Sequence, residues 1–153
     1  MSHIRVSANA AVVRDGRLLL VEFDDANGLH YNLPGGGCQP GETLEECVRR
    51  EVLEETCAQI TVGRVLLLRE YEPERVGQRF GGQHKLNVIF EGYLVEGSEP
   101  RLPDNPDAYQ TGVRWVPLAD LQTVDLVSAT LPAQLLDALS HPERGNDLYS
   151  VET

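Results

Sequence analysis

Cysteine is scarce in this chain of 153 residues, which holds three cysteines and no Cys-x-x-Cys pair. An odd count at the spacing of Cys38, Cys47 and Cys57 is a poor disulfide framework, and it lacks the ligand pattern of a structural zinc site. A chain of this length can bury a core without disulfides. We therefore expect three reduced thiols, as in a cytosolic protein.

Long hydrophobic runs and basic residues are also scarce. No stretch approaches the ~20 apolar residues of a membrane-spanning helix, and residues 1–13 lack the pattern of a secretory signal. The chain has 13 basic and 24 acidic residues, which gives a formal net charge of -11. Such a charge disfavours nucleic acid and anionic membranes as partners. We expect a cytoplasmic protein that acts on a small molecule.

The remaining composition is that of an ordinary folded domain. Hydrophobic residues make up 41% and charged residues 24% of the chain, which argues against disorder. The length fits one domain over residues 1–153. We expect an ordered core over about residues 3–141 and a loosely ordered tail over 142–153.

Local patterns predict mostly strands with a few helices. Residues 7–23 are typical of a β-hairpin, because Asp15-Gly16 is a strong turn signal. Strands are expected at 60–68, 86–95 and 113–116, helices at 43–57 and 132–140, and loops at 35–37 and 69–83. This order favours an α/β sandwich with a mixed β-sheet.

The helix predicted after Thr43 carries acids on the face where apolar side chains are expected. Thr43 and Glu46 match a capping box that begins the helix. At ~100° per residue, Glu51 and Glu55 continue the stripe begun by apolar residues, with Glu54 on its flank. These carboxylates repel one another at i,i+3 and i,i+4, and two lie near the helix C-terminus, where the dipole disfavours anions. Such conflicts are typical of functional sites.

A hard divalent cation would remove this conflict, because Mg²⁺ prefers carboxylate oxygens together with water and phosphate. Such a site supports phosphoryl chemistry by neutralising charge and activating water. The alternative is a solvated charged face with Arg–Glu pairs. The loop Gly35-Gly36-Gly37, directly before the helix, permits close approach to a ligand and favours the metal site.

The same residues match a known family motif. Gly36, Glu42 and the run Arg50-Glu51-Val52-Leu53-Glu54-Glu55 follow the spacing of the Nudix box, so the chain resembles the MutT-like Nudix hydrolases. Residues 33–36 and 113–118 are also similar to the family. Cys57 and Ala58 depart from the usual glycine and larger aliphatic. A cysteine in a left-handed helix cap would cost about 1 kcal/mol, but no expected ligand is lost.

The resemblance implies a single-domain Nudix α/β/α sandwich and a set of roles for the residues of the box. Glu51, Glu54, Glu55 and the carbonyl of Gly36 would bind Mg²⁺ or Mn²⁺. Arg50 would hold the glutamates by ion pairing, and Glu42 would be a structural partner. Water would then attack phosphorus in a nucleoside diphosphate linked to another group X.

The general base is left open by the resemblance, because it varies within the family. Glu51 or Glu54 could serve. Outside the box we nominate Glu91, although an alternating strand often presents one polar residue to solvent. His84 is a further candidate, with an ordinary solvated histidine as its alternative.

Substrate contacts are expected from arginines and aromatic residues. A basic cluster around the predicted loop 69–83 consists of Arg64, Arg69, Arg75, Arg79 and Lys85. Arginine recognises phosphate well, which favours Arg69 and Arg79 as substrate contacts. The alternative is that these arginines balance neighbouring acids. Tyr31 could stack on a base, or it could equally pack in the core. The apparent lack of an additional N-terminal domain tilts the expectation toward a nucleoside triphosphate or a modified nucleotide, although fold does not fix substrate.

Two other functions stay open from sequence alone. One is a nucleotide-binding or regulatory module that has the Nudix fold without catalysis, which the intact acidic residues argue against. The other is an isomerase of the same fold that acts on an isoprenoid diphosphate. Homodimerisation is an option, since several relatives form pairs.

Overall fold

The computed structural model describes residues 3–78, 81–143 and 149–151. In chain order the elements are β1 (Arg5–Arg14), β2 (Arg17–Asp25), β3 (Gly28–Asn32), β4 (Gly35–Gly37), α1 (Leu44–Thr56), β5 (Ile60–Tyr71), α2 (Pro73–Val76), β6 (Lys85–Leu94), β7 (Gln110–Pro117), the 3-10 helix η1 (Leu118–Thr123), α3 (Leu131–Ser140) and β8 (Tyr149–Val151).

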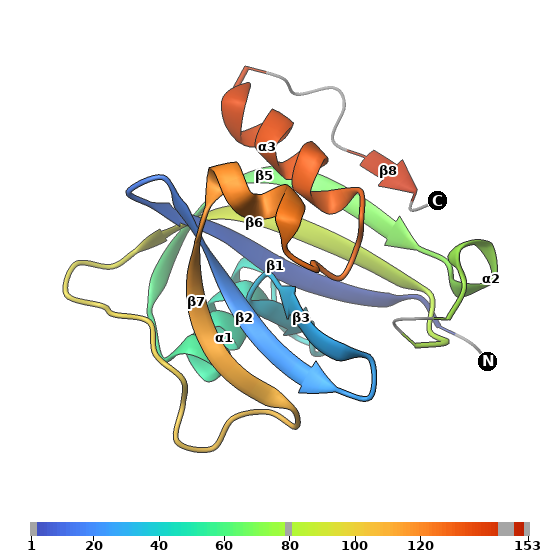
Figure 1. Ribbon diagram of the computed structural model, residues 1–153, viewed down its shortest axis with the longest axis horizontal. Coiled ribbons are helices and arrows are strands. Elements are labelled where there is room, and N and C mark those ends of the chain that lie inside the picture. The colour runs from blue at the N-terminus through green and yellow to red at the C-terminus, as the bar shows by residue number, and fades with distance from the viewer. Residues whose placement is uncertain (1–2, 79–80, 144–148, 152–153) are drawn as a thin grey trace.

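The strands form one mixed sheet between helices. Its order is β3-β2-β1-β6-β5-β8, with β4 added to β1 and β7 added to β2. The β1–β6 pair is parallel, whereas the β1–β2 and β5–β6 pairs are antiparallel. In Figure 1, α1 lies behind the strands and α3 with η1 lies above them. The α/β/α sandwich expected from the sequence is thus confirmed.

Alternation along the central strands builds a core on each face. Ala10 and Phe90 point toward α1, where they pack with Val48 and Val52. Their neighbours Ala11 and Ile89 point to the opposite face and pack with Leu131 and Leu135 of α3. Successive side chains along a strand point to opposite faces of the sheet. The position of a residue in β1 or β6 therefore determines whether it packs against α1 or against α3.

The predicted hairpin and both predicted long helices are present. Val13 pairs with Leu18 across a turn in which Asp15 and Gly16 have φ of 52° and 71°. Such a turn with two positive φ angles matches the twist of a two-residue hairpin. At the start of α1, the Thr43 side chain accepts from the backbone N–H of Glu46, and the Glu46 side chain accepts from that of Thr43. The capping box is therefore confirmed.

Three expected boundaries were wrong. Residues 35–37 form strand β4 rather than a simple loop, because three residues without side chains can press against β1. A Cβ on Gly35 would lie 2.3 Å from the Ala8 carbonyl oxygen. The strand predicted at 60–68 continues to Tyr71, where it pairs with Lys85. The loop predicted at 69–83 therefore begins later, and it contains the short helix α2.

The expected loose tail contains a strand. Tyr149–Val151 forms β8, which pairs in parallel with Leu68–Glu70 of β5. Tyrosine and valine favour strands, and the edge of β5 offers unpaired backbone groups to them. The other residues expected in the tail after 143 lie outside those described.

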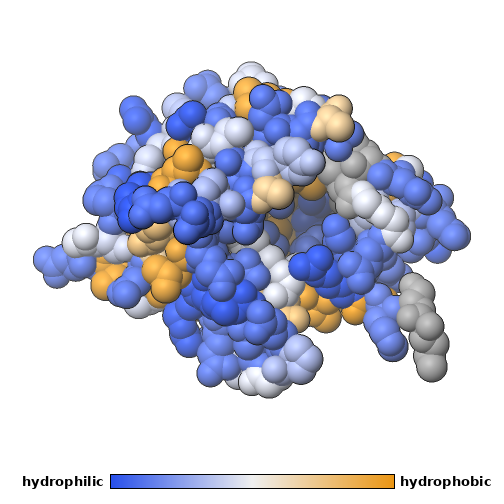
Figure 2. Space-filling view, turned by 90° about the horizontal axis from the view of Figure 1, so that it is seen from below, coloured by the Kyte–Doolittle hydropathy of each residue, from blue (hydrophilic) through white to orange (hydrophobic). Residues whose placement is uncertain are grey.

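The face of the molecule seen from below in Figure 2 is mainly polar. Figure 2 shows one face on which hydrophilic residues predominate and apolar residues occupy small separate areas. Within the described ranges, no helix is both long and apolar enough to cross a membrane.

Candidate metal and phosphate site

Helix α1 places its carboxylates beside strand β4. Cys47, Val48 and Val52 are buried against the sheet, and this anchors the helix. Glu55 lies on that same buried face with 6% of its surface exposed. The side chain of Glu51 is 14% exposed and that of Glu54 is 57% exposed. The three acids therefore run from the core to solvent, as their helical spacing predicts.

Arg50 donates hydrogen bonds to several residues of the box. Its Nε and Nη2 donate to the carboxylate of Glu42, and Nη2 also donates to the carbonyl of Gly37 at 3.1 Å. Its Nη1 donates to Glu51 at 2.8 Å and to Glu54 at 3.3 Å. One guanidinium thus joins the loop before α1 to two of the three glutamates. The expected role of Arg50 in positioning the glutamates fits this geometry.

These contacts change the acidity of both partners. The hydrogen bonds from Arg50, and next the backbone N–H of Gln39, lower the pKa of Glu42 from 4.5 to about 2. The hydrogen bond to Glu42 is also the largest factor that raises the pKa of Arg50. Both groups are charged at neutral pH, as a structural ion pair requires.

Glu51 lies directly against the glycine loop. A Cβ added to Gly36 would be only 2.5 Å from the carboxyl carbon of Glu51. Because no side chain fits in that gap, glycine is required there by close approach. The Gly36 carbonyl accepts a weak bond from the Cys47 thiol at 3.7 Å, which leaves it a second lone pair.

Glu55 is a buried acid in surroundings that disfavour its negative charge. The backbone N–H of Gly35 donates to its Oε2 at 3.5 Å. Burial first, and then the charge of Glu51, raise the pKa of Glu55 from 4.5 to about 9. A buried carboxylate without a cation is unfavourable, and a metal ion at this place would favour its charged form.

The residues present fit a hard divalent cation. Glu51, Glu54, Glu55 and the Gly36 carbonyl offer only oxygen donors, the set that Mg²⁺ prefers. Within the described part of the chain, no three His, Cys, Asp or Glu side chains are already gathered as a metal cluster. Here Arg50 binds Glu51 and Glu54 directly, so side-chain rotation would be needed to gather the ligands.

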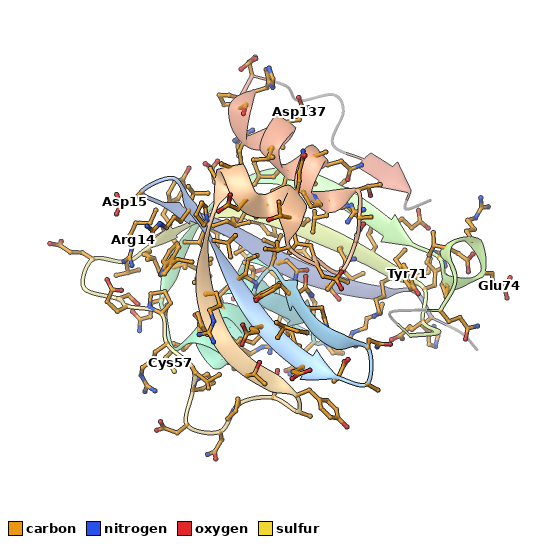
Figure 3. The ribbon with its side chains drawn as sticks, viewed as in Figure 1. Arg14, Asp15, Cys57, Tyr71, Glu74 and Asp137 are labelled. Carbon is orange, nitrogen blue, oxygen red and sulfur yellow. The ribbon has the colours of Figure 1, made fainter. Side chains whose placement is uncertain are left out.

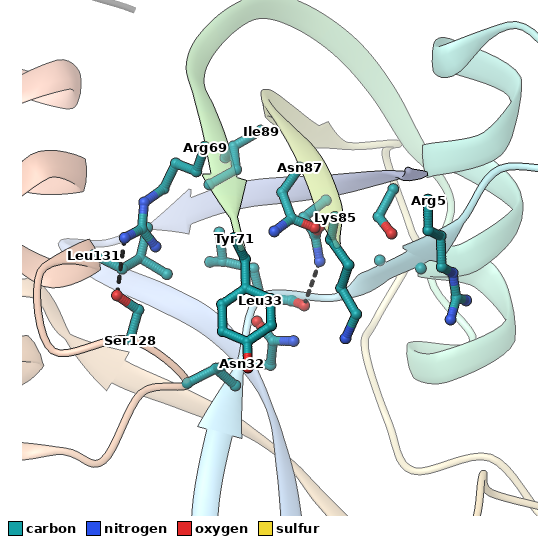
Figure 4. Close-up of a pocket in the computed structure, with 15 residues that line it drawn as sticks. Arg5, Asn32, Leu33, Arg69, Tyr71, Lys85, Asn87, Ile89, Ser128 and Leu131 are labelled. Carbon is teal, nitrogen blue, oxygen red and sulfur yellow. Dashed lines mark hydrogen bonds between the residues drawn. The ribbon is translucent and has the colours of Figure 1, made fainter. Parts of the chain in front are cut away.

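A pocket of about 200 Å³ adjoins this site on the α3 side of the sheet. It shares Gly35 and Gly36 with the carboxylate site, and its walls come from β1, β5, β6 and the segment before α3. Figure 4 shows Arg69, Ser128 and Leu131 along one side and Lys85 with Arg5 along the other. A substrate in this pocket would be next to the loop that meets Glu51.

The structure places the residues expected to contact substrate in different surroundings. Arg69 lines the pocket, and its Nη2 donates to Ser128 and Thr130, both at 2.8 Å. The Tyr31 hydroxyl instead donates to Glu22 at 3.2 Å, and its ring packs into the core, so Tyr31 does not line the pocket. Arg79 lies outside the described residues.

The two bases nominated outside the box are held elsewhere. Glu91 faces the α3 side of the sheet, as does Ile89, and its carboxylate accepts from Arg64 Nε at 3.0 Å. The α1 carboxylates lie on the opposite face of the sheet, and Glu91 as a base outside the box stays a prediction. His84 Nε2 lies 2.6 Å from Glu70 Oε1, a pair that accounts for the histidine without catalysis.

Sequence reasoning missed several pocket residues. Arg5, Asn32 and Asn87 all line the cavity, but they come from separate strands and share no motif. Arg5 pairs with Lys85, and Ser7 pairs with Asn87, across the parallel β1–β6 ladder. Only this register brings them together. Lys85 belongs to the basic cluster around the loop predicted at 69–83, but the sequence pattern gives it no particular role.

Comparisons with known proteins place these features in context. A family model described as NUDIX domain matches residues 3–137. Nucleoside triphosphatase NudI of Escherichia coli O1:K1 / APEC is 40% identical over 65 residues, which are 40% of this chain and 42% of that protein. The alignment thus covers less than half of either chain.

Solved structures are similar over most of the fold. A MutT NUDIX hydrolase from Burkholderia pseudomallei matches 88% of this chain and 98% of its own at 31% identity, with a TM-score of 0.69. An ADP-ribose pyrophosphatase from Streptococcus suis 89-1591 matches 98% of this chain and 100% of its own at 20% identity, with a TM-score of 0.67. At this identity, the second similarity shows the fold alone.

Proposed function

Because this chain belongs to the Nudix hydrolase family, we propose that it hydrolyses a phosphoanhydride bond in a nucleoside diphosphate linked to a group X, with Mg²⁺ or Mn²⁺ as cofactor. The observation that carries the proposal is the contact between the α1 carboxylates and the glycine loop. Glu51 is in contact with Gly36, and buried Glu55 accepts a long hydrogen bond from Gly35. Rotation of the Glu51 and Glu54 side chains away from Arg50 would bring these oxygens to one cation.

Different residues of the box would bind the metal ion, orient its ligands and accept a proton. Glu51, Glu55 and the Gly36 carbonyl would hold the ion together with Glu54. The bound ion would neutralise charge on the phosphate oxygens and make a coordinated water more acidic. Arg50 orients Glu51 and Glu54 through Nη1. Glu54 is the best placed to take a proton from water, because it is the most exposed of the three and is held only by bonds of 3.3–3.4 Å.

The pocket beside Gly36 would receive part of the substrate. The similar proteins include a nucleoside triphosphatase and an ADP-ribose pyrophosphatase, so both substrate classes belong in a test panel. The preference for a nucleoside triphosphate or modified nucleotide, the homodimer and the cytoplasmic location stay predictions.

A hydrolysis screen tests this function. The panel holds nucleoside triphosphates, oxidised nucleotides, ADP-ribose, sugar nucleotides, dinucleoside polyphosphates and an isoprenoid diphosphate, each with Mg²⁺ and with chelator. We expect turnover that needs metal and that Glu54→Gln lowers about 10²–10⁴-fold, the usual contribution of general acid–base catalysis. Glu45→Gln is the matched control, because Glu45 lies in the first turn of α1 and is 4.0 Å from Arg49.

The outcomes separate the alternatives. Equal loss of activity in Glu45→Gln and Glu54→Gln would argue against a specific site on the last turns of α1. Nucleotide binding without turnover on the whole panel would favour the binding module. Rearrangement of the isoprenoid diphosphate, without release of a phosphate-containing product, would favour the isomerase.

A further inference from the structure

The charge of the pocket beside Gly36 is opposite to that of the molecule. Three basic side chains line it, namely Arg5, Arg69 and Lys85, and none of the 15 described lining residues is Asp or Glu. The whole chain has 24 acids and 13 bases. Lys85 is its only lysine. A pocket without an acid among its described lining residues is a local reversal of charge in so acidic a protein, and it favours an anionic ligand.

The three basic groups come from three strands and lie along different parts of the wall. Arg69 of β5 is fixed by Ser128 and Thr130. Lys85 of β6 lies with its Nζ 5.8 Å from the centre of the Tyr71 ring. The guanidinium of Arg5 lies against Gly37, where a Cβ would be 2.3 Å from its Nη2. The positive charge thus extends toward the loop that leads to α1.

The positive charges of Lys85 and Arg5 repel one another. Burial, and next the charge of Arg5, lower the pKa of Lys85. Neighbouring cations of this kind are stabilised when an anion binds between them. Amide groups of Asn32 and Asn87, which also line the cavity, can donate hydrogen bonds to the same anion. This is an arrangement of charged and neutral donors suited to phosphate oxygens.

The size of the pocket points to a compact group. Its volume is about 200 Å³, below the ~300–1,000 Å³ of pockets that enclose drug-sized ligands. Tyr71 is the one aromatic residue among the described residues of its wall. A whole nucleoside would need more room, whereas a phosphate group and the atoms that carry it would not.

We propose that this pocket binds a further phosphate group carried by X, separate from the diphosphate that is cut. The preferred substrate is then a compound whose X group bears its own phosphate. This inference rests on the proposed function, because the pocket serves substrate only if the adjoining carboxylate site is catalytic. The pocket's affinity for phosphate, however, can be measured without catalysis.

The first test uses inorganic phosphate in the presence of a chelator, so that no metal contributes. An amine-directed reagent labels the Lys85 ε-amine and the N-terminus, and mass spectrometry measures the two separately. We expect saturating phosphate to slow labelling of Lys85 about tenfold, with the N-terminus as internal reference. Equal labelling of Lys85 with and without phosphate would overturn the proposal.

Calorimetry with inorganic phosphate provides the matched variants. Lys85→Met should weaken phosphate binding about tenfold or more, because a hydrogen bond to a charged group is lost. Arg75→Met is the control, since Arg75 lies on α2 and its side chain is 73% exposed. Equal affinities for the wild-type protein and Lys85→Met would contradict the assignment.

The second test compares substrates that differ by one phosphate on X, such as ADP-ribose 1″-phosphate with ADP-ribose. We expect the wild-type protein to favour the phosphorylated member in kcat/KM. Lys85→Met should lose this preference mainly through KM, whereas Arg75→Met keeps it. If hydrolysis needs metal and Glu54 but no pair is discriminated, the phosphate proposal fails alone. If nothing is hydrolysed, the proposed function fails, and phosphate labelling still decides whether the pocket binds an anion.

Discussion

Cys57 is the residue that ends α1, in a conformation that suits glycine better. Its φ of 58° and ψ of 8° are left-handed, and its N–H donates to the Leu53 carbonyl. A Cβ in this conformation costs about 1–2 kcal/mol, which glycine avoids. The sequence comparison with the Nudix box predicted this strain. Figure 3 shows Cys57 and the pocket residue Tyr71 on opposite sides of the molecule.

Replacing Cys57 with glycine should therefore stabilise the protein. We expect Cys57→Gly to raise the free energy of unfolding by up to about 1 kcal/mol, because the loss of strain is partly offset by a more flexible unfolded chain. For a domain of this size, the melting temperature should rise by about 2–4 °C. Calorimetry measures both. Cys57→Ala retains the Cβ and should bring no such gain, so an equal rise in both variants would contradict the strain.

At the same scale, sequence predicts some site residues well and others poorly. Glu51, Glu54 and Glu55 are close in sequence, and the helical period alone brings them together. Glu91 is different, because its face depends on how β6 is paired with β1 and β5. Tyr31 likewise is drawn into the core by its bond to Glu22. A single polar or aromatic residue in a strand carries no signal for which of these outcomes applies.

At the scale of elements, the Glu42–Arg50 pair fastens the segment before α1 to the helix itself. Arg50 also reaches the Gly37 carbonyl, so one side chain fixes the end of β4 against α1. The backbone N–H of Gln39 donates to the same carboxylate at 2.8 Å. The relative position of Gly36 and Glu51 therefore depends on this pair.

The contribution of the pair to stability should depend on pH. Folding lowers the pKa of Glu42 from 4.5 to about 2, so its stabilisation is fully present above pH 4.5 and is lost as pH falls toward 2. Urea unfolding of the wild-type protein and Glu42→Gln at several pH values measures this. We expect the difference between them to be constant above pH 5 and to shrink below pH 4.5. A difference that does not change down to pH 2 would rule out the ion pair as its cause.

The elements themselves were mostly predictable, and the exceptions have a physical cause. The hairpin at Asp15-Gly16 and the capped helix at Thr43 follow from local chemistry. Strand β4 does not, because three glycines have no intrinsic preference for a strand. They are extended only because β1 offers a partner for Gly35–Gly37. Pairing with a neighbouring strand thus determines the secondary structure where the local sequence has no preference.

At the scale of the whole molecule, the two faces of the sheet carry different functional groups. The α1 face supplies the carboxylates, and the α3 face supplies the basic pocket, with Gly35 and Gly36 common to both. Residues from β1, β5 and β6 meet in that pocket through the parallel β1–β6 and antiparallel β5–β6 ladders. Sequence alone predicted the sandwich but not the register, and the pocket depends on the register.

This arrangement couples the stability of the fold to the metal. Glu55 is buried beside Glu51 in surroundings that disfavour its negative charge, so the metal-free protein carries a cost for holding this acid in place. An ion that binds only the folded protein stabilises it by mass action, by about 2.7 kcal/mol when its concentration is 100 times Kd. Function and stability therefore oppose each other at this residue until metal is bound.

Replacing Glu55 with glutamine separates the two effects. In chelator, we expect Glu55→Gln to be at least as stable as the wild-type protein, because a neutral side chain of similar shape replaces a buried acid. With saturating Mg²⁺, the wild-type protein should gain stability and the variant should gain little. Thermal unfolding in chelator and across a Mg²⁺ series measures both effects, with Glu45→Gln as the control that keeps the full metal response. An equal response to Mg²⁺ in Glu55→Gln and wild type would remove Glu55 from the ligand set. A large loss of stability in chelator would instead mean that the carboxyl itself stabilises the metal-free fold.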